Sequence, residues 1–93
     1  MEEYTLLKAI VELYNFKSKS KSLIFEIRFN DVTRTIKIGK QWGKVSKEYQ
    51  YFIHETYGPC LASNESNFIA HLAAISGIAT GINVVKYKVY KIS

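Results

Sequence analysis

The chain contains one cysteine and two histidines, the residue types best suited to nucleophilic catalysis near neutral pH. Cys60 could act as a nucleophile if His54 or His71 lay close enough to accept its proton. No third group that would orient such a base is recognisable, and the three residues do not have the spacing of a zinc site. We therefore expect no catalytic residue, no metal site and no cofactor, and we predict that the protein is not an enzyme.

A stretch rich in glycine and lysine, residues 39–46 (GKQWGKVS), resembles a phosphate-binding loop at first sight. In that loop four residues separate the two glycines, and the lysine is followed directly by serine or threonine. Here three residues separate the glycines, and Val45 stands between the lysine and the serine. The pattern argues against nucleotide hydrolysis, although an anion could bind at the start of a following helix.

Basic residues offer a better lead. The formal net charge is +5, which favours anionic partners. Lysines gather over residues 17–21 and again over residues 37–47, and the second cluster contains a tryptophan. Nucleic-acid binding needs cations that pair with phosphates and aromatic rings that stack on bases. We predict a nucleic-acid-binding surface made of Arg28, Lys37, Lys40, Trp42, Lys44, Lys86, Lys88 and Tyr90.

The same surface allows a second interpretation. Lysines on a strand can simply keep a surface hydrated and protect a sheet edge. A basic sheet face could also bind an acidic protein surface, and an edge strand over residues 10–16 or 82–92 could pair with a second copy to form a homodimer. Small basic domains of this composition are common among viral and mobile-element accessory proteins, some of which inhibit host machinery. A protein-binding module or inhibitor of that type is therefore the alternative to nucleic acid.

Length and composition predict a single domain over residues 1–93, because the chain is too short for two. Hydrophobic residues make up 47% and aromatic residues 14%, more than a disordered chain would carry. The lone cysteine cannot form an internal disulfide, which favours a reducing compartment. The acidic start of the sequence also lacks the pattern of a secretory signal. A cytoplasmic location is expected.

An uncharged run over residues 66–85 has the length of a membrane span. It includes several polar residues and two glycines, which argue against insertion into a bilayer. The polar members are Asn67, His71, Ser76, Thr80 and Asn83. We expect a buried helix followed by a strand, and no contact with a membrane.

Hydrophobic periodicity predicts the elements that would position these side chains. Residues 4–16 fit either a helix or a strand, and the second half favours a strand that pairs with residues 23–29. Residues 23–29 and 32–38 alternate between apolar and polar side chains, as strands do, around a tight turn at Asn30-Asp31. Residues 82–92 form the last predicted strand.

Between these strands the pattern becomes helical. Residues 39–43 are predicted to form a turn, and Ser46 is a suitable N-cap for a helix that ends at Gly58-Pro59. A second helix is predicted from about residue 64 to residue 79. Because that helix is apolar nearly all round, we expect it to be the more deeply buried of the two.

The predicted fold is an α+β domain of two layers. Its element order is β-β-β-α-α-β, with a helical hairpin packed on one face of an antiparallel sheet. The other face, basic and partly aromatic, would be open to a partner.

Overall fold

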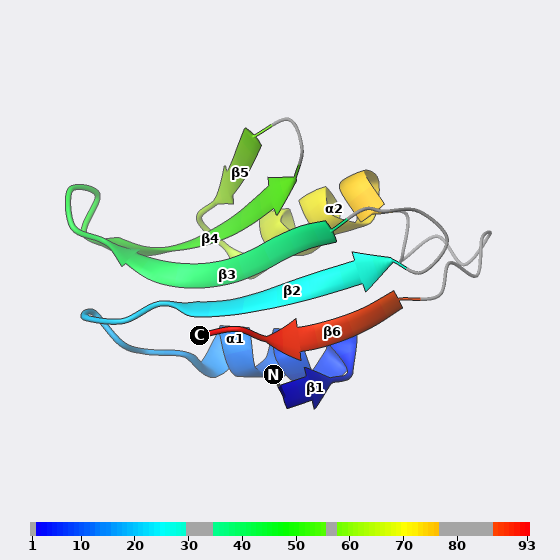
Figure 1. Cartoon of the computed structure of the whole chain (residues 1–93). Helices are drawn as coiled ribbons and strands as arrows, with labels where there is room; N and C mark the ends of the chain where they lie inside the picture. Colours follow the sequence, from blue (N-terminus) through cyan, green and yellow to red (C-terminus); the bar gives the residue numbers. More distant parts are fainter. Residues whose placement is uncertain (1, 30–34, 56–57, 77–86) are drawn as a thin grey trace.

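The computed structural model describes residues 2–29, 35–55, 58–76 and 87–93. One antiparallel sheet of six strands runs in the order β1-β6-β2-β3-β4-β5 (Figure 1). Two helices pack against it. The elements in chain order are β1 (Glu2–Tyr4), α1 (Leu6–Asn15), β2 (Leu23–Phe29), β3 (Thr35–Gly43), β4 (Glu48–Glu55), β5 (Gly58–Ala62), α2 (Glu65–Ser76) and β6 (Tyr87–Lys91).

Helix α1 forms where the sequence allowed either helix or strand. Thr5 caps it, since the Thr5 side chain accepts a hydrogen bond of 3.1 Å from the backbone N–H of Lys8. Ala9 and Leu13, four residues apart, lie on one face of the helix and are fully buried. The preference for a strand over residues 10–16 was therefore wrong, because the helical face buries more apolar surface than a hairpin strand would.

The helix predicted from residue 46 to the Gly58-Pro59 stop does not form. Residues 44–47 are a turn and residues 48–55 are strand β4, which pairs with β3 along its whole length. Tyr51 and Ile53 are buried on the face that the helices cover, and Phe52 is buried on the other face against Gly39. A strand that buries both faces loses the alternation that identifies strands, and its apolar residues then mimic a helical stripe.

The predicted turn over residues 39–43 also shifts along the chain. Strand β3 continues to Gly43, and the turn to β4 follows it over residues 44–47. Lys47 closes the turn with a positive φ of 55°, and its N–H donates to the Gly43 carbonyl at 2.7 Å. The long β3–β4 hairpin extends well beyond the layer of helices (Figure 1). This extension decides which side chains of β3 reach solvent.

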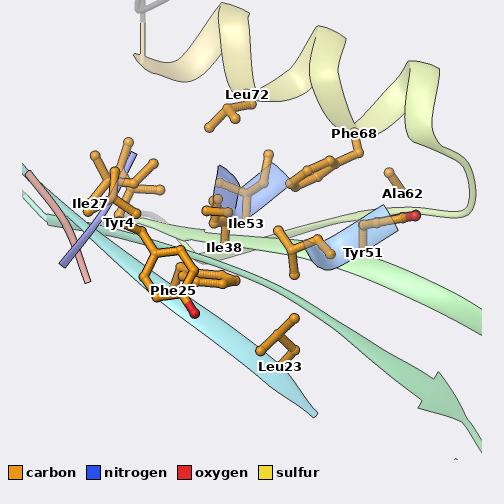
Figure 2. Packing of buried hydrophobic residues seen from close by; sticks show 14 of the residues in the cluster. Tyr4, Leu23, Phe25, Ile27, Ile38, Tyr51, Ile53, Ala62, Phe68 and Leu72 are labelled. Carbon is orange, nitrogen blue, oxygen red and sulfur yellow. The ribbon is translucent and has the colours of Figure 1, made fainter. Parts of the chain in front are cut away.

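The core lies between the sheet and both helices (Figure 2). Tyr51 is buried in this core, and its ring stacks on Phe68 of α2 at 4.9 Å and meets Tyr14 of α1 edge-on at 6.1 Å. Phe68 and Leu72 point from α2 toward the strands, whereas most other described side chains of α2 are exposed. Helix α2 is therefore buried on one side only, which corrects the expectation of burial all round.

The predicted class, an α+β fold with an antiparallel sheet and helices on one face, is confirmed. The helical layer is broadly as expected, but its members are α1 and α2, which are separated in the chain by four strands. Strand 23–29 is confirmed as β2, while the Asn30-Asp31 turn and the starts of the strands predicted at residues 32 and 82 lie outside the described residues. No helix in the described ranges has the length and apolar character needed to cross a membrane.

The edges of the sheet also differ from the expected ones. Residues 10–16 belong largely to α1, and β6 lies between β1 and β2. The two outer strands are β1 and β5. Among the described strands, a dimer formed by strand pairing would therefore use β1 or β5.

Candidate functional site

Lys40, one of the predicted binding residues, is 1% exposed and lies under the helices. Its Nζ donates to the Tyr14 carbonyl at 3.2 Å and lies 5.1 and 5.0 Å from the ring centres of Tyr49 and Tyr51. Burial lowers the pKa of Lys40, nearby Lys17 lowers it further, and Glu65 opposes both. A cation here satisfies a carbonyl of the last turn of α1, where the helix dipole is negative.

Lys40 therefore stabilises the fold and cannot meet a ligand at the surface, so its assignment to the binding surface was wrong. The physical reason is the extra length of β3. Because the strand runs on through residues 39–43, alternation places residues 36, 38 and 40 on the face covered by the helices.

The predicted surface on β2 and β6 is mixed in charge. The Arg28 guanidinium forms an ion pair with Glu26 and lies 4.7 Å from the ring centre of Tyr90. Tyr90 lies opposite Glu26 on one side and opposite Glu3 on the other, and Lys88 lies opposite Arg28. Lys86 is outside the described residues. The carboxylates beside Arg28 and Tyr90 reduce the attraction of this region for a polyanion.

The two lysine clusters of the sequence meet at one end of the molecule. The loop of residues 16–22 leads from α1 into β2, and it lies beside the β3–β4 hairpin (Figure 1). The Lys19 ammonium lies 4.4 Å from the ring centre of Trp42, and the Lys17 ammonium lies 5.2 Å from that of Tyr49. We call this surface the basic end; its exposed lysines are Lys17, Lys19, Lys21, Lys44 and Lys47.

Trp42 and Tyr49 are the hairpin residues whose rings contact the loop lysines. They are register partners across the hairpin, and their rings meet nearly edge-on at 4.8 Å. A hollow of about 190 Å³ lies between the loop and the hairpin. Its lining consists of Lys19, Ser20, Lys21, Ser22, Gln41, Trp42 and Lys44. Ammonium and hydroxyl donors that converge on one hollow suit an anionic group such as a phosphate.

A second hollow lies on the open face of the sheet and has a volume of about 320 Å³. Its lining consists of Ile24, Lys37, Gln41, Phe52, His54 and Leu61. The Phe52 ring lies directly over Gly39, where an added Cβ would come within 2.3 Å of Phe52 Cζ. Of these lining residues the sequence predicted only Lys37, because Phe52 was assigned to a helix. A glycine inside a strand was the available signal, since it often marks a close approach.

A polar pair joins the sheet to α2 on the opposite face. The Tyr51 hydroxyl donates to Glu65 Oε1 at 2.9 Å. Burial, and then the carboxylate of Glu65, raise the pKa of Tyr51 far above its usual range. Glu65 is the first residue of α2, and its own backbone N–H followed by the Tyr51 hydroxyl lowers the pKa of its carboxyl group. The Tyr51 hydroxyl therefore stays protonated and the Glu65 carboxyl group stays ionised, which is the combination that forms this hydrogen bond.

We expect Glu65→Gln to lower the free energy of unfolding at neutral pH by at most about 1 kcal/mol, since the side chain is exposed and water screens it. The folded-state pKa of Glu65 lies below the ordinary value of 4.5. Its contribution is therefore complete above pH 4.5 and is lost as the pH falls through the folded-state value. Urea unfolding of both proteins at several pH values measures this, and a constant difference down to the lowest pH would contradict it.

Cys60 and His71 lie close together. They are one of the two pairs considered from the sequence. Cys60 Sγ lies 2.7 Å from His71 Nδ1. His71 is exposed on α2, and His54 is on β4 rather than on a helix. Neither Cys60 nor His71 lines the two hollows. Across the described ranges, no three residues of metal-binding type gather into a possible site.

Comparison of the chain with protein-family models, with curated proteins and with solved structures finds no match in any of the three. Inference about function therefore depends on the geometry and charge of the chain's own residues.

Proposed function

We propose that the protein is a non-enzymatic nucleic-acid-binding domain that contacts phosphates through the basic end. The observation that carries this proposal is the meeting of two lysine clusters, distant in sequence, around Trp42 and the hollow of about 190 Å³. Each phosphate that a lysine neutralises releases counterions, and this release supplies most of the affinity for nucleic acid. An enclosed group of ammonium donors with an aromatic ring is the arrangement that such binding requires.

The basic end is better suited to phosphates than the surface on β2 and β6. Its lysines lie on a loop and a hairpin that project from one end of the sheet (Figure 1). Arg28, by contrast, forms an ion pair with Glu26. A base that stacks on Trp42 would displace the Lys19 ammonium from its ring. The free Lys19 side chain would then be available to a phosphate. A cytoplasmic location accords with the free thiol and belongs to the same proposal.

One observation favours a second candidate, a protein-binding module or inhibitor of the viral or mobile-element accessory type. Val45, in the hairpin turn, is 98% exposed and lies between Lys44 and Lys47 in the sequence. An acidic partner with a small apolar pocket could accept Val45 and pair with these lysines. Substitution of Val45 by serine separates the two functions, because it would weaken that partner and leave nucleic-acid binding unchanged.

A salt titration tests the nucleic-acid proposal. We expect Lys19→Ala and Lys44→Ala to weaken binding of a fluorescent single-stranded oligonucleotide and to reduce the slope of log K against log salt by about 0.7 each. Fluorescence anisotropy at several salt concentrations measures both quantities. Lys8→Ala is the matched control, because Lys8 is an exposed lysine in the first turn of α1. Its slope should stay at the wild-type value.

Two results would count against the basic end. Absence of binding to DNA and RNA at low salt would exclude a nucleic-acid function. A reduced slope in Lys88→Ala with an unchanged slope in Lys44→Ala would instead assign the phosphates to the open face of β2 and β6.

A further inference from the structure

The two hollows adjoin one another, because Gln41 lines both. The register of β2 with β3 explains why the two hollows share this residue. Leu23 lies opposite Lys40 and Ile24 opposite Gly39, so the lysine-serine loop enters β2 beside Gln41. The basic end and the hollow on the open face of the sheet are therefore neighbours that share Gln41.

The second hollow differs in chemistry from the first. Its lining has three apolar side chains, Ile24, Phe52 and Leu61, and three polar ones, the ammonium of Lys37, the amide of Gln41 and the imidazole of His54. The rings of Phe52 and His54 lie 5.1 Å apart and are tilted by 59°. Its volume of about 320 Å³ is at the lower end of the range for small-molecule sites. Apolar side chains together with an amide and an imidazole suit one nucleobase.

We infer that the protein binds single-stranded rather than double-stranded nucleic acid, with one unstacked base in the hollow over Phe52 and the neighbouring phosphates at the basic end. This inference rests on the proposed function. Lys37 is exposed at the rim and would pair with the phosphate of the bound nucleotide. In a duplex the bases are stacked and paired, and extruding one costs a few kcal/mol. Open sheets that carry aromatic side chains bind unstacked bases in the same manner.

The test compares Leu61→Ser with Leu7→Ser. Leu61 is 56% exposed at the hollow, and Leu7 is 73% exposed on α1, in the other layer. The probes are a fluorescent single strand of about 12 nucleotides and its duplex, since single-strand sites span roughly 4–16 nucleotides. We expect Leu61→Ser to weaken single-strand binding about fivefold, with no change in salt slope because no charge is altered. Leu7→Ser should have no effect, and duplex binding should be weaker and equal in all three proteins.

A second variant, His54→Ala, keeps the test valid if Leu61→Ser unfolds, because His54 is exposed on β4. It should also weaken single-strand binding without changing the duplex. The inference is overturned if the duplex binds as tightly as the single strand, or if Leu61→Ser and His54→Ala match Leu7→Ser. An acidic peptide that loses affinity in Leu61→Ser while the single strand does not would assign the hollow to a protein partner.

Different results would contradict nucleic-acid binding by the basic end and base binding in the second hollow. If lysine substitutions at the basic end weaken binding and Leu61→Ser does not, nucleic-acid binding stands and the base-binding hollow is wrong. If no substitution in either hollow alters binding, both proposals are wrong.

Discussion

Phe68→Ala is expected to lower the free energy of unfolding by about 3–5 kcal/mol. The Phe68 ring is 0% exposed and stacks on Tyr51 at 4.9 Å, with the two planes 21° apart. Its removal leaves a cavity between α2 and the sheet and removes the ring that stacks on Tyr51 (Figure 2). Since small domains are stable by only about 5–15 kcal/mol, this loss would remove a large part of the total.

Urea or thermal unfolding followed by circular dichroism measures the effect of Phe68→Ala. Leu7→Ala is the control, because Leu7 also lies in a helix and is 73% exposed. It should stay within about 0.5 kcal/mol of the wild type. Equal stabilities of the two variants would mean that α2 does not pack on the sheet through Phe68.

Gly39→Ala is expected to cost about 2 kcal/mol of stability and also to weaken single-strand binding. An added Cβ would come within 2.3 Å of Phe52 Cζ and 2.7 Å of the Leu23 carbonyl oxygen. The backbone oxygen cannot rotate away as a side chain can, so strands β2 and β3 would have to separate locally. The Phe52 ring would be pushed out over the hollow where we place the base.

Gly43→Ala is the matched control, because it makes the same change in the same strand. There the nearest atoms are Ser46 Oγ at 2.3 Å and the end of the Gln50 side chain at 3.1 Å, and both residues are partly or fully exposed. These side chains can move, and we expect a cost below about 1 kcal/mol. Unfolding measurements and single-strand anisotropy on both variants provide the test. A smaller loss for Gly39→Ala than for Gly43→Ala would contradict the placement of Phe52.

Hydrophobic periodicity predicted an element correctly where the element buries only one face. Residues 23–29 alternate, with every second side chain buried, and they form β2 with the predicted ends. The apolar stretch after residue 64 forms α2, since Phe68 and Leu72 are spaced for one helical face. The same reasoning failed for β4, because Phe52 is buried on the open face by its contact with Gly39. The residue that covers such a side chain cannot be identified from the periodicity of its own strand.

Composition and spacing therefore determined the class of fold, the excess of positive charge and the presence of aromatic residues among the lysines. Tertiary structure alone decided which lysines are available. Lys40 is buried because β3 is longer than its pattern indicated, while Lys19 and Lys44 line one hollow because a loop and a hairpin project from the same end of the sheet. The reason is physical: alternate residues of a strand face opposite sides, so the position of a turn decides whether each side chain meets the core or the solvent.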